Sequence, residues 1–270
     1  MKAKSNGIEI NYAVEGPEDA PVVVMSHSLA SGHRMWDSQM PVLSDYRVYR
    51  FDTRGHGGTD APDGPYDLDM LADDARGLLD ALGLDAVHFV GLSMGGMIGQ
   101  MLAIKYPEVL LSATLCATSS RMPEEAWPAW RERIDTARAH GMEALVEATI
   151  ERWFTRDFIA SNENTVGPIR DLVRSTPVQG YTSCIEAIMK LDITDRLRSV
   201  NLPTLIIAGE DDESTPVAAH EAIHAAVTGS ELVVVPTAKH FVNVEQGGPV
   251  NDALSRFLAR HTGGQARAAE

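Results

Sequence analysis

The sequence predicts an α/β protein: a mostly parallel β-sheet flanked by helices, with a helical cap inserted before the last strands. Through residue 119, short apolar runs alternate with helical patterns, as in parallel strands joined by helical crossovers. The alternation then stops, and residues 121–198 are amphipathic with no strand-like run. We therefore expect a core of residues 1–119 and 199–262, a cap of residues 120–198 and a disordered tail, rich in Gly and Ala, at 263–270.

The expected strands differ in how much of their surface the sheet covers. Residues 8–14 alternate apolar and polar side chains, which fits a half-buried strand pair at the sheet edge. Continuous apolar runs instead fit strands covered on both faces, as in a parallel sheet between helices. Such a run occurs at residues 22–25, and further strands are expected at residues 48–51, 87–90, 110–117, 204–208 and 232–235.

Apolar residues at helical spacing predict the helices of the core. The clearest pattern runs over residues 68–82, with aspartates on the opposite face and near its start. Further helices are expected after Ser93 to about Lys105, around residues 220–227 and near residues 252–258.

Composition limits the function classes. The 270 residues are 44% hydrophobic and carry a formal net charge of −15, which argues against nucleic acid or an anionic membrane surface as a partner. No apolar run approaches the roughly 20 residues that span a bilayer, and the N-terminus lacks the apolar segment of a signal peptide. Cys116 and Cys184 fit buried thiols rather than a disulfide framework or metal site. We expect a cytoplasmic protein that acts on small molecules.

Ser93 is the strongest candidate for a reactive side chain. Residues 91–95 (GLSMG) match G-x-S-x-G between an apolar strand and a helix, a strained turn that exposes the serine hydroxyl. Gly91 and Gly95 fit because a side chain at either position would collide with neighbouring backbone. The helix N-terminus that follows favours a developing oxyanion.

A serine nucleophile needs a base, and the base needs an acid to orient it. Asp212 follows the strand at 204–208 and His240 follows the strand at 232–235. This order of serine, acid and histidine is that of the α/β-hydrolases. An acidic solvated loop at 211–213 is the alternative for Asp212, but its G-x-x-D-x-x-T-P spacing favours the acid role.

Over residues 5–260 the sequence resembles the α/β-hydrolase superfamily, and more narrowly the 3-oxoadipate enol-lactonases of aromatic degradation. The stretch ERWFT in the predicted cap is the most family-specific, because it lies outside what the superfamily shares. The resemblance rests on residues 26–29 (SHSL), 35–37 (MWD), 54–57 (RGHG), 91–96 (GLSMGG), 151–155 (ERWFT) and 209–216 (GEDDESTP).

The resemblance implies a role for each matching position. Ser93 would be the nucleophile, His240 the general base and then acid, and Asp212 the acid that orients it. The backbone N–H groups of Leu29 and Met94 would form the oxyanion hole. Ser28 stands where the superfamily usually has glycine, and the enol-lactonases also tend to have serine there.

The predicted cap supplies candidate substrate-binding residues. Trp130 and Trp153 fit either the hydrophobic core or a substrate wall, and Ser28 lies on the facing loop. An anionic substrate would need a local cation in so acidic a protein, and Arg133 and Arg152 are the candidates, with exposed helix arginines as the alternative.

Two positions depart from the family pattern. Lys239 precedes His240 where a small residue is usual, so its cation either lowers the pKa of the histidine or points to solvent. Glu213 stands where proline often follows the aspartate.

Residues 54–57, including His56, are predicted to be a structural turn that braces the site. Five other histidines are expected either on the surface or in helices where their ring nitrogens have hydrogen-bond partners: His33, His88, His140, His220 and His224.

These observations predict a serine hydrolase, with no cofactor and no metal, that opens a small lactone or ester, most specifically 3-oxoadipate enol-lactone. A broader carboxylesterase, a cofactor-free perhydrolase or haloperoxidase, and a small-ligand receptor are the alternatives. No His, Cys or carboxylate spacing resembles a metal-ligand set.

Overall fold

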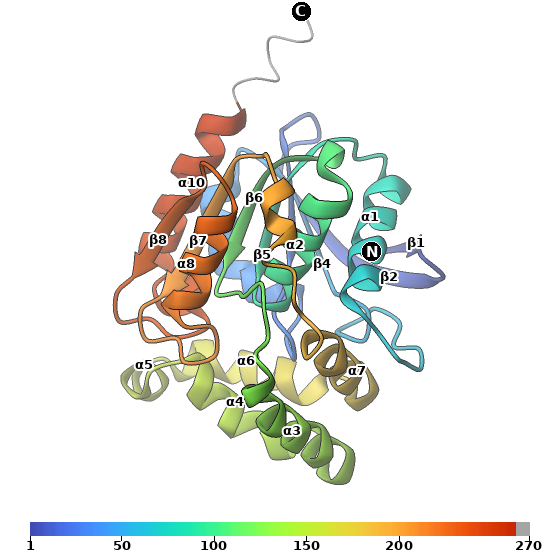
Figure 1. The fold of residues 1–270 in the computed structure, drawn as a ribbon, viewed down its shortest axis with the longest axis vertical. Helices are drawn as coiled ribbons and strands as arrows, with labels where there is room; N and C mark the ends of the chain where they lie inside the picture. Colours follow the sequence, from blue (N-terminus) through green and yellow to red (C-terminus); the bar gives the residue numbers. More distant parts are fainter. Residues whose placement is uncertain (263–270) are drawn as a thin grey trace, which may run out of the picture.

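Eight strands form one sheet in the computed structural model, which describes residues 1–262 (Figure 1). The order is β1-β2-β4-β3-β5-β6-β7-β8. The first two pairings, β1 with β2 and β2 with β4, are antiparallel, and all later pairings are parallel. The strands are β1 Lys2–Ser5, β2 Ile8–Glu15, β3 Val22–Ser26, β4 Arg47–Phe51, β5 Val87–Leu92, β6 Leu110–Cys116, β7 Thr204–Gly209 and β8 Glu231–Val235.

The core helices pack in groups around the sheet. One group contains α1 and α2, which contact each other and strands β1, β5 and β6, together with α8 on β7 and β8. The other contains the 3₁₀ helix η1, α9 and α10, which contact one another. Their bounds are η1 His33–Leu43, α1 Leu68–Leu82, α2 Met94–Lys105, α8 Val217–Ala226, α9 Val242–Glu245 and α10 Gly247–Thr262.

The central strands carry the most complete burial, as the continuous apolar runs predict. All six residues of β5 and all six of β7 are buried. The run at 232–235 is the exception, because β8 is an edge strand with a neighbour on one side only. Its Val234 side chain is 40% exposed, so this strand is only partly covered.

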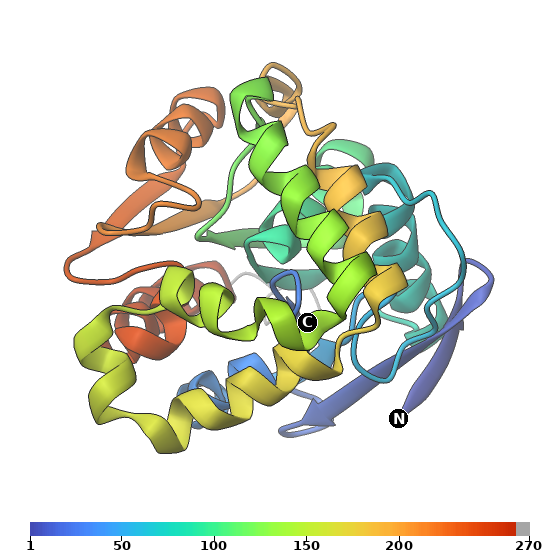
Figure 2. The same cartoon turned by 90° about the horizontal axis from the view of Figure 1, so that it is seen from below.

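Between β6 and β7 the chain is helical, and this cap lies beneath the carboxyl ends of the strands (Figures 1 and 2). Its first and last backbone segments run side by side: Met122 N–H donates to Leu191 O, and Ile193 N–H donates to Ser120 O, both at 2.8 to 2.9 Å. The main cap helices are α3 Trp127–His140, α4 Val146–Trp153, α5 Arg156–Ser161, α6 Glu163–Ser175 and α7 Val178–Ile188.

Other expectations from the sequence have mixed outcomes. Cys116 and Cys184 are buried free thiols, as predicted. His88 is placed wrongly by the sequence: it is a buried residue of strand β5 whose Nδ1 is hydrogen-bonded to the Ser112 hydroxyl. Within residues 1–262 no helix is both long and apolar enough to cross a membrane. The tail predicted to be disordered, 263–270, lies outside the described residues.

Candidate active site

Ser93 lies at the tight turn between β5 and α2, in a backbone conformation that residues other than glycine rarely adopt. Its φ is 56° and its ψ is −114°. A Cβ atom on Gly91 would lie 2.2 Å from Gly95 O, and one on Gly95 would lie 2.3 Å from Ser26 O. Both separations are far below van der Waals contact, which confirms the predicted reason for the two glycines.

Hydrogen bonds on both sides hold the strained serine in place. Its N–H donates to Cys116 O at 2.9 Å, and the hydroxyl of Thr118 donates to Ser93 O at 2.8 Å. The surrounding structure therefore over-determines the backbone of Ser93, which is the condition under which such strain persists.

Asp212 and His240, the predicted acid and base, are in direct contact. His240 Nδ1 lies 2.8 Å from Asp212 Oδ2, and both side chains are buried. The same oxygen accepts a bond from the hydroxyl of Thr215 at 2.6 Å. The other oxygen, Oδ1, accepts from the N–H groups of Ser214 at 2.8 Å and Thr215 at 3.1 Å.

This environment keeps Asp212 ionised. Burial by itself would raise the pKa of the Asp212 carboxyl, but the charge of His240 and the hydrogen bonds from His240 and Thr215 outweigh it and lower the pKa. A carboxylate at Nδ1 fixes the proton on that nitrogen and leaves Nε2 as the basic atom.

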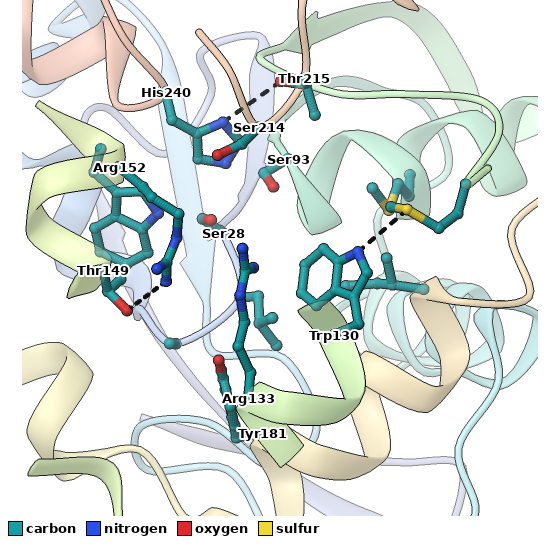
Figure 3. Close-up of a pocket in the computed structure, with 16 residues that line it drawn as sticks. Ser28, Ser93, Trp130, Arg133, Thr149, Arg152, Tyr181, Ser214, Thr215 and His240 are labelled. Atoms are coloured by element: carbon teal, nitrogen blue, oxygen red, sulfur yellow. Dashed lines mark hydrogen bonds between the residues drawn. The ribbon is translucent and has the colours of Figure 1, made fainter. Parts of the chain in front are cut away.

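The basic edge of His240 and the hydroxyl of Ser93 line the same pocket (Figure 3). The hydrogen bonds formed within residues 1–262 include none between these two side chains. Such bonds are often long without a ligand and tighten when substrate binds. The geometry therefore permits Ser93, His240 and Asp212 to act in sequence as nucleophile, base and orienting acid.

The two predicted oxyanion donors have no competing acceptor. Across the described chain, no hydrogen bond uses the N–H of Leu29, and Met94 is the first residue of α2, whose N–H has no intrahelical partner. The loop is held beside Leu29, where Ala30, with φ 58°, donates its N–H to His56 Nε2 at 3.1 Å. His56 thus braces this loop, as the sequence predicts for the 54–57 turn.

A second buried histidine supports the same loop from below. His27 Nδ1 donates to Ser28 O at 2.7 Å, and its Nε2 accepts from the N–H of Thr53 at 2.8 Å. Burial lowers the pKa of His27 and lowers that of His56 to about 3, so both rings are neutral near pH 7. A neutral ring can both donate and accept, and each ring does so, because His56 Nδ1 also donates to Arg54 O at 3.2 Å.

The cap side of the pocket carries two guanidinium groups, from Arg133 on α3 and Arg152 on α4 (Figure 3). Arg152 donates to the hydroxyl of Thr149 at 2.8 Å, and Arg133 lies over the Trp130 ring at 4.5 Å. Burial lowers the pKa of both, and repulsion by Arg133 helps to lower that of Arg152 to about 10. Among the described residues neither forms a salt bridge.

The pocket brings together every predicted substrate-binding residue. Its lining contains Ser28, Leu29, Ser93, His240 and all four cap candidates, whereas Met94 is not part of the lining and Asp212 lies behind His240. Trp153 belongs both to the pocket wall and to the hydrophobic core, because it lines the pocket and also stacks on Phe241 with ring centroids 3.9 Å apart. Sequence reasoning missed other lining residues: Ala30, Met97, Met122, Thr149, Tyr181, Ile188, Ser214 and Thr215.

Side chains separate this pocket from a larger neighbouring cavity. The pocket has a free volume of about 50 Å³, against about 380 Å³ for the cavity. Met122, Trp130 and Arg133 line both spaces. Ligand sites commonly measure roughly 300–1,000 Å³. The pocket by itself is therefore smaller than this range, and it shares part of its lining with the larger cavity.

The two departures from the family pattern do not intrude on the pocket. The ammonium of Lys239 donates to Glu151 O on the cap at 3.0 Å, so it neither contacts the His240 ring nor points freely to solvent. Glu213 is exposed. Within residues 1–262 no group of three or more His, Cys, Asp or Glu side chains could hold a metal ion.

Comparison with known proteins matches this geometry to one family. The family model described as alpha/beta hydrolase fold matches residues 21–246. The chain is 35% identical to 3-oxoadipate enol-lactonase 2 of Acinetobacter baylyi (strain ATCC 33305 / BD413 / ADP1) over 94% of each chain.

Two solved structures are also similar. The enol-lactonase from Burkholderia xenovorans LB400 superposes with a TM-score of 0.92 at 35% identity, over 96% of this chain and all of that one. A thermophilic esterase from Thermogutta terrifontis with malate bound gives a TM-score of 0.90 at 28% identity, over 97% of this chain and 98% of that one.

Proposed function

The chain belongs to the α/β-hydrolase family and is an ester-hydrolysing enzyme, and from this premise we propose that it is a serine hydrolase for a small lactone that carries a carboxylate. We propose 3-oxoadipate enol-lactone as the substrate, which would place the enzyme in the breakdown of aromatic compounds. The relatives named as enol-lactonases support this choice of substrate.

The first half of the proposed reaction forms an acyl-enzyme. His240 Nε2 takes the proton of the Ser93 hydroxyl while Oγ attacks the lactone carbonyl. The oxyanion of the tetrahedral intermediate accepts hydrogen bonds from the N–H groups of Leu29 and Met94, which are free to donate. The carbon–oxygen bond of the ring then breaks, and the enol oxygen takes the proton from His240.

The second half releases the product. The enol becomes a ketone, while the acyl group remains on Ser93. Water gives a proton to His240 and attacks the ester carbonyl, and the proton then passes to Ser93 Oγ as the acyl bond breaks. Asp212 keeps its charge throughout and stabilises the imidazolium form of His240.

The cap supplies recognition of the substrate carboxylate in this proposal. Arg133 and Arg152 face the pocket, and no carboxylate of the described chain forms a salt bridge with either. An anionic ligand would relieve their mutual repulsion and accept charge-assisted hydrogen bonds. The observation that carries the proposal is this pairing in one pocket: a serine and histidine on the core side, and two guanidinium groups without a salt bridge on the cap side.

A broader esterase is the second candidate, supported by the likeness to the Thermogutta terrifontis esterase. The two functions share the residues on the core side and differ in what the cap arginines require. A lactonase of this design prefers a carboxylate-bearing substrate, whereas a broad esterase cleaves neutral short-chain esters as well or better.

The test measures opening of 3-oxoadipate enol-lactone and cleavage of p-nitrophenyl acetate by the wild type, Ser93→Ala and the control Ser38→Ala, a change at an exposed serine on η1. We expect efficient lactone opening that falls by about 10⁴-fold or more in Ser93→Ala and is unchanged in Ser38→Ala. Serine-dependent ester cleavage with negligible lactone opening would replace the lactonase by the esterase. Turnover that survives Ser93→Ala would reject the serine mechanism.

A further inference from the structure

The cap and the loop that carries His240 are joined by a dense set of contacts, which we call the cap–histidine junction. It consists of residues 151–155 at the end of α4 and residues 239–245 of the loop and α9. The first of these segments is the ERWFT stretch, the part of the cap by which the sequence most resembles the enol-lactonases. The contacts give this stretch a structural task beyond that of lining the pocket.

Glu245 is the centre of the junction. It is only 8% exposed, and each of its two oxygens serves one segment. Oε1 accepts from the N–H of Thr155 at 2.7 Å and from the hydroxyl of the same residue at 2.6 Å. Oε2 accepts from the N–H of Lys239 at 2.7 Å. One carboxylate thus ties the cap to the residue immediately before His240.

The residue after His240 is tied to the cap as well. The N–H of Phe241 donates to Trp153 O at 3.1 Å, and the two rings stack at 3.9 Å. The Lys239 ammonium adds its bond to Glu151 O. His240 therefore sits between two residues whose backbone N–H groups are both held, one by Glu245 and one by the cap itself.

We propose that Glu245 is a positioning residue for His240, acting through the cap–histidine junction. Resting on the proposed function, this inference gives the cap a part in the chemistry as well as in binding. A proton shuttle depends on ring placement within fractions of an ångström. Partners that orient metal-bound histidines typically contribute 10- to 100-fold, and we expect an effect at the lower end of that range here. Asp212 fixes the ring from Nδ1, and Glu245 fixes the backbone that carries the ring.

The test uses Thr155→Val, which removes one hydroxyl donor while keeping the side-chain shape, and Thr155→Ser, which restores it. Glu245→Gln replaces one carboxylate oxygen by an amide NH₂, so the side chain can accept from Thr155 or from Lys239 but not from both. The matched control is Glu147→Gln, the same change at an exposed cap residue that pairs with Arg170.

We expect Glu245→Gln and Thr155→Val to lower kcat by about 10-fold with KM within twofold, and to shift the acid limb of the pH profile of kcat/KM. Thr155→Ser should recover most of the rate, and Glu147→Gln should behave as the wild type. If Glu245→Gln does not fold, the Val and Ser pair at position 155 carries the test.

A junction that only stabilises the fold would give a different pattern: a lower Tm in Thr155→Val with kcat and the pH profile unchanged, which would overturn the proposal. Failure of the proposed function is distinguishable, because it appears as turnover that survives Ser93→Ala in the same assays. Normal kinetics in Glu245→Gln together with an inactive Ser93→Ala rejects the positioning role alone.

Discussion

The two sides of the pocket differ in how completely their polar groups are satisfied. On the core side, the Asp212 carboxylate accepts four hydrogen bonds, from Ser214, Thr215 twice and His240. On the cap side, Arg133 and Arg152 are partly buried next to each other, and in the described chain no carboxylate pairs with either.

This difference separates chemistry from recognition. Groups that must hold one geometry through a reaction are fixed by the fold, because reorganising them during the reaction would cost rate. Groups that must bind an incoming charge are left with unused hydrogen-bonding capacity, and the ligand completes them. The following predictions test whether the two sides can be impaired independently.

The largest expected effect is on the core side. Asp212→Asn removes the charge that stabilises the imidazolium form of His240 and allows the wrong tautomer, so we expect kcat to fall by about 10⁴-fold. Stopped assays of lactone and p-nitrophenyl acetate should show the same loss, since both use the same proton shuttle. Asp211→Asn, at the exposed neighbouring position, is the control and should keep full activity. A loss of less than tenfold would contradict the role given to Asp212.

An intermediate effect is expected on the cap side, and only with charged substrates. Arg152→Met or Arg133→Met should lower kcat/KM for the carboxylate-bearing lactone by about 10- to 100-fold, the value of a charged hydrogen bond, and leave a neutral ester unchanged. The Tm should hold or rise, because an unpaired, partly buried charge is removed.

The control for the cap arginines is Arg138→Met, an exposed arginine paired with Glu186. It should leave both substrates unaffected. Equal losses with the charged and the neutral substrate would show that the cap arginines support the fold of the pocket rather than bind a carboxylate.

The smallest expected effect concerns the histidines that brace the core side. The pKa of His56 is about 3 in the folded protein against an ordinary 6.5. Below pH 6.5 the unfolded chain therefore binds more protons than the folded protein, and the free energy of unfolding decreases as the pH is lowered. At pH 5 the loss from this one group is about 2 kcal/mol, and it stops growing below pH 3.

Urea unfolding at pH 7 and pH 5 measures this loss. His56→Gln keeps a donor and an acceptor but cannot be protonated, so its stability should fall less between the two pH values than that of the wild type. His140→Gln, at an exposed cap position, should lose as much stability between the two pH values as the wild type does. Identical losses in all three would show that His56 titrates normally in the folded state.

The sequence suffices for the parts of the site that depend on local backbone. Gly91, Ser93 and Gly95 lie within one turn, and the short spacing from each late strand limits where Asp212 and His240 can lie. Parallel strands bring such positions to one edge of the sheet, so topology alone predicts that they converge.

Residues whose role depends on packing between distant segments were not predictable in this way. Tyr181 and Thr149 reach the pocket from cap helices whose sequences carry no chemical motif. Glu245 is an ordinary acidic residue of a short helix until the cap folds against it. Lys239 also depends on packing between distant segments. The sequence predicted that its ammonium group lies next to His240 or in solvent, whereas in the structure it donates to the Glu151 carbonyl of the cap.

The paired backbone bonds at the two ends of the cap, between Ser120 and Ile193 and between Met122 and Leu191, have a consequence for how such a protein can change. The chain enters and leaves the cap at nearly the same point, within the connection between two adjacent parallel strands. The cap is thus an insertion whose two ends already lie together, and lengthening such a connection costs little entropy. A differently shaped insert, grafted between these closed ends, would leave the strand register and the serine turn intact, but it would need its own contacts to the His240 loop to bring a new specificity to the site.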